Sequence, residues 1–170
     1  MSMEERPRLS VGVTFPQHGA CLCGELRYSL GEDPVTLYVC HCTDCQRQSG
    51  ASFSLSMIVR RDALEVLRGR PEQYAVELAD GRVKRAHFCG RCSTRLWGPS
   101  SIETLAVLEP GTLDDTSWLR PVGHIWTQSA QPWVVISEDS LRCSEGPSDE
   151  EALGFVRAWK RRRASESGAA

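Results

Sequence analysis

The stretch Gly19–Gly24, with the sequence GACLCG, places two cysteines one residue apart between glycines, and two further cysteine clusters follow it. The second cluster is CHCTDC at Cys40–Cys45, and the third is CGRC at Cys89–Cys92. Thiolates separated by one or two residues can converge on a single tetrahedral Zn²⁺ at about 2.3 Å per bond. The spacing of all three clusters is therefore typical of metal ligands.

The three clusters together hold seven of the eight cysteines. Seven ligands are too many for one tetrahedral zinc and one too few for two closed sites. The count favours one closed Cys₄ site and one Cys₃ site with an open position. A closed site is usually structural, and an open position for water or substrate is usual in a catalytic site. The alternative is that both sites are structural.

A disulfide framework is the competing interpretation, because an even number of cysteines could form four bridges. The first fifteen residues contain Glu4, Glu5, Arg6 and Arg8 and no apolar run resembling that of a signal peptide, so we expect a cytoplasmic protein. In that compartment, clustered cysteines more often bind metal or act in catalysis. The sequence therefore predicts zinc, with two ions per chain.

Length and charge bound the remaining possibilities. A chain of 170 residues fits one domain, and 20 basic against 22 acidic residues give a formal net charge of -2. This balance carries no electrostatic signature of nucleic-acid binding. No segment approaches the roughly 20 apolar residues of a membrane span. We therefore expect no nucleic-acid or membrane partner, and the oligomeric state stays open.

Hydrophobic periodicity predicts strands along most of the chain. Residues Ser52–Val59 alternate serines with Phe53, Leu55, Met57 and Val59, and Glu25–Leu30 shows the same period of two. Further strands are predicted at Thr36–Cys40, Leu64–Leu67, Gln73–Val76, Lys84–Cys89, Thr104–Leu108, Val122–Trp126 and Trp133–Ile136. Many short strands separated by turn residues indicate a mainly β fold, a zinc-containing β-sandwich of short antiparallel strands.

A C-terminal helix is predicted over residues 148–163. Ser148 and Glu151 fit a capping box, and Leu153, Val156 and Trp159 form an apolar stripe. We expect this helix to dock on the strands and to complete a single zinc domain over residues 16–163. Residues 1–15 and 164–170 are expected to be flexible segments.

Several stretches in a fixed order carry a family resemblance. They are GACLCG with Tyr28, CHCTDC with Ser49-Gly50-Ala51, FCGRC at Phe88–Cys92, GTLD at Gly111–Asp114, Pro121, HIW at His124–Trp126 and Pro132-Trp133. Together they resemble the glutathione-dependent formaldehyde-activating enzyme (GFA) family, whose domain also occurs in centromere protein V. The resemblance runs from about Gly19 to Ile136.

The resemblance implies a division of the cysteines between the two metals. Cys21, Cys23, Cys89 and Cys92 would hold the structural zinc, and Cys40, Cys42 and Cys45 the catalytic one. It also implies a carbon–sulfur lyase type of reaction, in which a small-molecule thiol such as glutathione adds reversibly to formaldehyde or a related carbonyl.

The chain departs from the family pattern at two places. Cys92-Ser93-Thr94-Arg95 stands where the family more usually has Cys-Gly-Thr-Pro, and Gln46 stands where an arginine often follows the third catalytic cysteine. Neither change removes a metal ligand, but both lie where a substrate could be recognised. Arg47 and Arg95 are candidates to hold a glutathione carboxylate, since a guanidinium can bind a carboxylate through two hydrogen bonds.

A Cys₃ zinc suits thiol chemistry, because a soft, sulfur-rich zinc accepts a further thiolate. The seven cysteines do not decide whether the metal binds the thiol, the carbonyl oxygen or a water. His41 could be a fourth ligand, but neighbouring residues on an extended strand point to opposite faces, so we expect a supporting or surface role. His124 could face the core or line the pocket, and Cys143 stands alone as a small apolar residue.

The alternative function is a zinc-stabilised binding module, similar to a zinc ribbon, that recruits protein or nucleic acid. Ligand pairs of zinc ribbons lie about 15–20 residues apart. The separation between Cys23 and Cys89 is far larger, and a ribbon has no use for a third cluster. The sequence therefore favours the enzyme.

Overall fold

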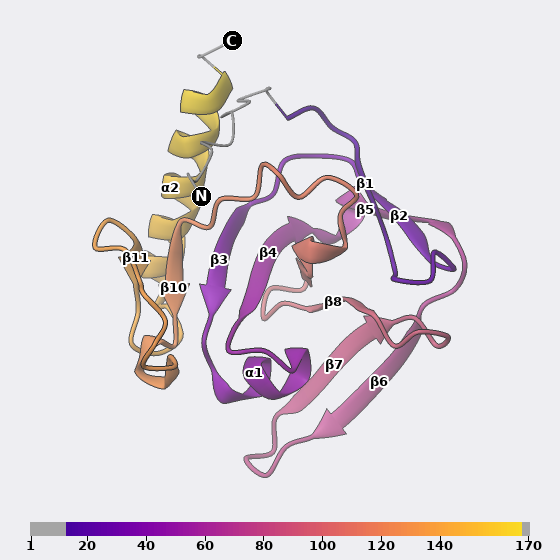
Figure 1. The fold of residues 1–170 in the computed structure, drawn as a ribbon, viewed down its shortest axis with the longest axis horizontal. Coiled ribbons are helices and arrows are strands. Elements are labelled where there is room, and N and C mark those ends of the chain that lie inside the picture. Colours follow the sequence, from indigo (N-terminus) through magenta and orange to yellow (C-terminus); the bar gives the residue numbers. More distant parts are fainter. Residues whose placement is uncertain (1–12, 168–170) are drawn as a thin grey trace, which may run out of the picture.

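The computed structural model describes residues 13–167, which form two β-sheets and a long C-terminal helix (Figure 1). The smaller sheet has the order β1-β2-β5, with β1 at Gln17–Ala20, β2 at Arg27–Leu30 and β5 at Leu64–Arg68. The larger sheet contains, from edge to edge, β11 (Leu141–Arg142), β10 (Gly123–Ile125), β3 (Thr36–Cys40), β4 (Ser54–Arg60), β9 (Leu105–Leu108), β8 (Arg95–Pro99), β7 (Val83–Phe88) and β6 (Glu72–Glu77).

Two α-helices complete this part of the chain, α1 at Thr43–Ser49 and α2 at Asp149–Ser167, together with the short 3₁₀ turns η1 (Arg61–Ala63), η2 (Pro110–Thr112) and η3 (Thr127–Ser129). The mainly β fold with a C-terminal helix is confirmed. Figure 1 shows α2 beside β10 and, at the far side of the molecule, the β6–β7 hairpin.

The expectation of antiparallel strands is wrong at one end of the larger sheet. β10 runs parallel to both of its neighbours, β3 and β11. Parallel neighbours need a crossover connection of a dozen or more residues. A long connection through η2 brings the chain back beside β3, where Val122 N donates to Leu37 O and His41 N donates to Ile125 O.

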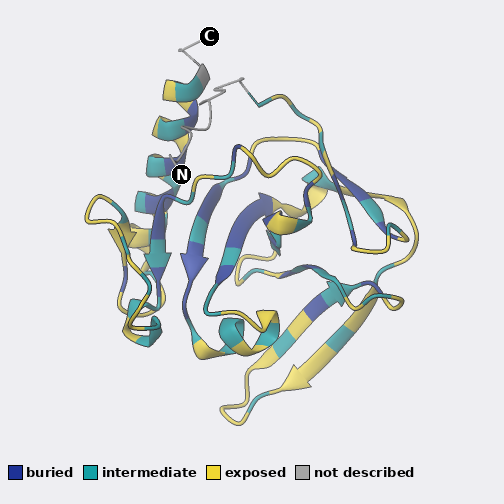
Figure 2. Cartoon of the chain, in the orientation of Figure 1, coloured by how far each residue is buried: buried dark blue, intermediate teal, exposed yellow. Residues whose placement is uncertain are grey.

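The β4 strand has the expected alternation but is not half-buried. Ser54 and Ser56, on the face expected to meet solvent, are both buried. Met57 and Val59 on the other face belong to the hydrophobic core. Figure 2 shows β3 and β4 as the dark centre of the larger sheet. One face of β4 therefore packs in the hydrophobic core, and the face that carries the serines contributes to the candidate site.

The other strand predictions agree with the structure at some positions and differ from it at others. Thr36–Cys40 matches β3, but the expected strand at Trp133–Ile136 is a loop whose Trp133 and Val135 side chains are largely exposed. Strands β1, β8 and β11 and helix α1 were not expected. β8 contains Gly98 and Pro99, which weaken the sequence signal for a strand.

A close backbone approach explains the first glycine of GACLCG. A Cβ atom at Gly19 would lie 2.4 Å from the ring of Tyr28 and 2.6 Å from the carbonyl oxygen of Thr112. The Tyr28 hydroxyl in turn hydrogen bonds to Thr112 Oγ1 at 2.7 Å. Only glycine permits this contact between β1, β2 and η2, so the glycine two residues before Cys21 is packed against the core.

The helix α2 docks on the larger sheet, and Trp159 of the predicted stripe is buried, but the buried face does not include Leu153. Phe155, Trp159 and Arg163 are buried at a spacing of four residues, whereas Leu153 is 57% exposed. The capping box is present, because Ser148 N donates to Glu151 Oε2 at 2.8 Å. No helix within residues 13–167 is long and apolar enough to cross a membrane.

Parts of the two segments expected to be flexible pack against the rest of the domain or continue its helix. Helix α2 continues beyond residue 163 to Ser167, since Arg163 bridges Asp33 at 3.1 Å and Glu166 at 2.7 Å. At the other end, Phe15 packs edge-on against Trp118 with ring centroids 6.2 Å apart. The rest of both segments, residues 1–12 and 168–170, lies outside the described residues.

We expect Trp159→Ala to lower the free energy of unfolding by about 3–5 kcal/mol, because the indole is 1% exposed and its removal leaves a cavity under α2. Leu153→Ala is the matched control on the exposed face and should change the free energy by about 0.5 kcal/mol or less. Urea unfolding measures both. Equal losses would mean that the helix does not use this face.

Candidate metal centres

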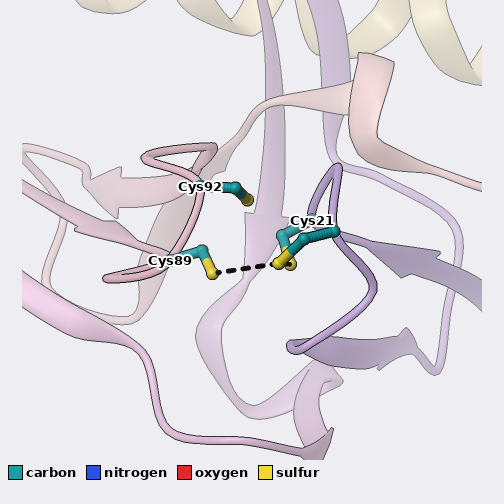
Figure 3. A group of neighbouring side chains, drawn as sticks. Cys21, Cys89 and Cys92 are labelled. Atoms are coloured by element: carbon teal, nitrogen blue, oxygen red, sulfur yellow. Dashed lines mark hydrogen bonds between the residues drawn. The ribbon is translucent and has the colours of Figure 1, made fainter.

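The first centre joins two turns from different sheets. Cys21 and Cys23 lie in the turn between β1 and β2, and Cys89 and Cys92 lie in the turn between β7 and β8. The four sulfur atoms all lie within 4.8 Å of one another. Cys23 Sγ is 3.6 Å from Cys21 Sγ and 3.8 Å from Cys89 Sγ. Figure 3 shows the side chains of the two turns facing one another.

These distances fit a tetrahedral thiolate site. A tetrahedron with Zn–S bonds of about 2.3 Å has edges of about 3.8 Å. Donors also point at the sulfur atoms: Leu26 N lies 3.2 Å from Cys21 Sγ, and Thr94 Oγ1 lies 3.2 Å from Cys92 Sγ. The hydrogen bond from Thr94 lowers the pKa of Cys92 to about 5. The chemistry of this donor set therefore fits a metal ion held by four thiolates.

The second of these turns carries one of the departures from the family pattern. Ser93 has a φ of 59°, in the left-handed region that glycine adopts without penalty. Its amide donates to Cys89 O at 2.7 Å, which closes the turn around the two ligands. A side chain in this conformation costs about 1–2 kcal/mol. The turn geometry is thus retained without the glycine.

The second centre is formed by one strand end and one short helix. Cys40 is the last residue of β3, Cys42 is the N-cap of α1, and Cys45 lies in its first turn. The three sulfur atoms lie within 4.8 Å of one another, and Cys45 N donates to Cys42 Sγ at 3.4 Å. Thiolate capping therefore orients two of the three candidate ligands.

The thiols of this cluster share protons unequally. Hydrogen bonds from Cys40 and Cys45 lower the pKa of Cys42 to about 2, and the nearby Lys84 ammonium acts in the same direction. The same contact with Cys42 raises the pKa of Cys40. One thiolate is thus stabilised by the protons of its neighbours. A cation in their place could stabilise all three thiolates, which is what a metal site requires.

Only the second centre opens on the large cavity of the described residues. This cavity has a volume of about 350 Å³. Its wall includes Cys40, Cys42 and Cys45 but none of the four cysteines of the first centre. The wall also includes Tyr38, Asp44, Ser54, Arg82, Lys84, Arg85, Arg95 and Glu109. The first centre therefore has four sulfur atoms and lies away from this cavity, whereas the second has three and faces a space that a small molecule can enter.

The two arginines proposed from the sequence occupy different positions. Arg95 lines the cavity, and its Nη1 atom lies 3.0 Å from Glu109 Oε1. Arg47 is exposed on α1 and is not among the lining residues, so the structure does not bring it to the cavity. The side of this short helix that meets the cavity carries Cys45 and Gln48. Arg47 is therefore left on the side that faces solvent.

Sequence reasoning missed the basic wall of the cavity, formed by Arg82 and Lys84. Arg82 Nη2 lies 3.3 Å and Lys84 Nζ 3.8 Å from Asp44 Oδ2 on α1. These pairs hold the start of β7 against the helix that carries Cys45. A signal was present in the sequence, because a basic stretch precedes the third cysteine cluster. This stretch is far from Cys45 in sequence, so its position beside the three-cysteine cluster could not be inferred.

His41, which lies between two cysteines of the second centre in sequence, pairs with His124. His41 is fully buried, so a surface role is wrong, and its Nε2 atom lies 2.9 Å from His124 Nδ1. Neither histidine belongs to a cysteine cluster or lines the cavity. Gln46 Nε2 donates to His41 O at 2.7 Å and to Ser129 O at 2.9 Å. Gln46 therefore ties the ligand loop to η3. Cys143 is buried, as expected for a small apolar residue.

The fold and the two centres define a class of protein: a β-rich domain with two cysteine clusters that could bind metal ions, one of them at a cavity. The model of the glutathione-dependent formaldehyde-activating enzyme family matches residues 16–129, more than half of the chain. The chain belongs to this family. A crystal structure of a Rhodobacter sphaeroides protein aligns with a TM-score of 0.47 and 17% identity, covering 59% of this chain and 91% of that one.

The two centres should respond differently to loss of a ligand. A closed zinc site contributes on the order of 10 kcal/mol to folding in small metal domains. We therefore expect Cys89→Ser to leave the chain unfolded or insoluble, and Cys42→Ser to keep the fold. Thermal unfolding and metal analysis of both variants measure this. Equal loss of fold would contradict the division into a closed and an open centre.

Proposed function

We propose that this protein is a zinc enzyme of the carbon–sulfur lyase type that adds a thiol such as glutathione reversibly to formaldehyde or a related carbonyl. Cys21, Cys23, Cys89 and Cys92 hold a structural zinc, and the cluster of Cys40, Cys42 and Cys45 holds a catalytic one. The observation that carries the proposal is that the three-cysteine cluster lines the cavity and the four-cysteine cluster does not.

Zinc bound to three thiolates offers a position to a fourth and favours the deprotonated form of an incoming thiol. The residues that line the cavity hold the thiol beside the cluster and limit the access of water. Holding the thiol and the carbonyl together converts an encounter of two molecules into a step within one complex.

The basic wall suits a thiol that carries carboxylates. Lys84 lies on the face of β7 that meets α1 and the cavity, with its Nζ atom 3.8 Å from Asp44 Oδ2, whereas Arg95 is engaged by Glu109. Neighbouring residues of a strand point to opposite faces, so the Arg85 side chain lies on the face of His87 and Trp97, away from the cavity. We therefore assign the outer carboxylate contact to Lys84 and keep Arg95 as an inner contact. The cytoplasm is the proposed location, because there glutathione is abundant and cysteines stay reduced.

Glutathione should bind the zinc-loaded protein through its sulfur atom, because the thiolate is the ligand. S-Methylglutathione, which cannot form a thiolate, should bind far more weakly. Calorimetric titration of both compounds, with Cys42→Ser as the control variant, tests this. If the thioether binds as well as the thiol, the proposed chemistry is wrong and a non-enzymatic binding module is favoured.

Lys84→Gln should weaken the binding of glutathione about tenfold or more, because a charge-assisted hydrogen bond contributes about 1.5–3 kcal/mol. The binding of 2-mercaptoethanol, which has no carboxylate, should not change. Arg91→Gln is the matched control, since Arg91 is exposed in the β7–β8 turn and does not line the cavity. Equal effects on both thiols would contradict the carboxylate contact.

A further inference from the structure

Glu109 is an acidic residue in the wall of the cavity whose position is fixed on several sides. Its amide donates to Leu96 O at 2.8 Å. Its carboxylate accepts a hydrogen bond from Ser54 Oγ at 3.1 Å and pairs with Arg95 Nη1 at 3.0 Å. The side chain is only 18% exposed. A charged group this enclosed is costly to keep without a partner, and Arg95 provides that partner.

The β3–β4 register places this carboxylate close to the three-cysteine cluster. Ser54 is the direct cross-strand partner of Cys40. Side chains of directly opposite residues share a face, with Cβ atoms about 4.5–5.5 Å apart. Both residues line the cavity, as does Glu109. Glu109 therefore lies one side chain away from a candidate metal ligand.

The proposed reaction needs a group that moves a proton. A thiol at neutral pH is mostly protonated, since its pKa is about 8.5, so a proton must leave the sulfur before attack. The carbonyl oxygen gains a proton when the carbon–sulfur bond forms. A residue beside both atoms can accept the first proton and donate it to the oxygen.

Other titratable groups around the cavity suit this task less well. Burial raises the pKa of Tyr38, and the nearby Cys40 adds to the rise. Asp44 is held by Arg82 and Lys84. The groups that share the cavity with Glu109 are Tyr38, Cys40, Cys42, Asp44, Cys45, Arg82, Lys84, Arg85 and Arg95. Burial raises the pKa of Glu109 and the Arg95 charge opposes this rise, which suits a carboxylate that takes up and releases a proton.

We propose that Glu109 is the proton-transfer residue of the thiol–carbonyl addition, with Ser54 and Arg95 as its positioning residues. The Glu109 carboxylate accepts the proton of the incoming thiol. The sulfur lone pair then forms the bond to the carbonyl carbon, the π pair of the C=O bond moves to oxygen, and Glu109 returns the proton to that oxygen. Thiol and carbonyl combine with no proton gained or lost overall. This inference rests on the proposed function.

The number of protons released on thiol binding tests the proposal without any turnover. Glutathione is titrated into the zinc-loaded protein at pH 7 in PIPES and in Tris, whose ionisation enthalpies differ. The wild type should release few protons to the buffer, because Glu109 retains the thiol proton. Glu109→Gln should release about one proton per bound thiol. Glu103→Gln, an exposed residue before β9, is the matched control and should match the wild type.

Activity gives a second, independent readout. The exchange of formaldehyde with S-hydroxymethylglutathione, followed by NMR, should slow about 10²-fold or more in Glu109→Gln, the usual contribution of a general acid–base residue. Glu109→Asp keeps a carboxylate and should retain the thiol proton. If Glu109→Gln is unstable because Arg95 is left unpaired, the double variant Arg95→Gln/Glu109→Gln removes that charge and should still release the proton.

Each outcome separates this proposal from the one on which it depends. If the wild type does not bind glutathione, the proposed function fails and the role of Glu109 fails with it. If the wild type binds glutathione but Glu109→Gln or the double variant releases as few protons as the wild type, only the role of Glu109 is overturned. An unchanged exchange rate in Glu109→Gln overturns it in the same way.

Discussion

The convergence of two turns on one set of four sulfur atoms is the constraint on which the rest of the structure depends. Cys23 and Cys89 are 66 residues apart in sequence, yet their sulfur atoms lie 3.8 Å apart. One turn belongs to the smaller sheet and the other to the larger sheet. Closing such a long loop costs conformational entropy, and a metal ion bound across it would offset that cost. The four-cysteine centre therefore fixes where β7 and β8 lie relative to β1 and β2.

The position of β7 then determines the chemistry of the cavity. Its first residues carry Lys84 and Arg85, and the ion pairs with Asp44 draw this end of the strand against α1. The Gln48 side chain also donates to the Tyr74 hydroxyl on β6, which joins the same hairpin to the same helix. The four-cysteine centre therefore acts on the three-cysteine centre indirectly, by holding one end of the hairpin whose other end forms the basic wall.

The sequence predicted the parts of this molecule that depend on local pattern. The strand Thr36–Cys40 follows from periodicity, and the grouping of the cysteines follows from the count of seven ligands together with the family resemblance. Both agree with the structure. The buried face of α2 did not follow, because the contact of Arg163 with Asp33 depends on tertiary packing. The place of Glu109 also depends on a pairing between distant strands, and the GTLD stretch that follows it carries the family resemblance without marking Glu109 as a site residue. Arg47 shows the converse, since nearness to Cys45 in sequence does not put a side chain in the cavity.

The three-cysteine centre must admit an anionic thiol although its own charge is negative, which the four-cysteine centre need not do. Three thiolates exceed the charge of one divalent cation, so a metal-loaded cluster of Cys40, Cys42 and Cys45 remains negative and repels an anionic thiol. In a cavity with low-dielectric walls such repulsion is stronger than in water. The cations Arg82 and Lys84 on the facing wall counter it and concentrate anions at the mouth of the site. Glu109 does not cancel this effect, because Arg95 neutralises its charge within the wall. The same wall can therefore attract an anionic thiol while keeping one carboxylate beside the cluster to handle its proton.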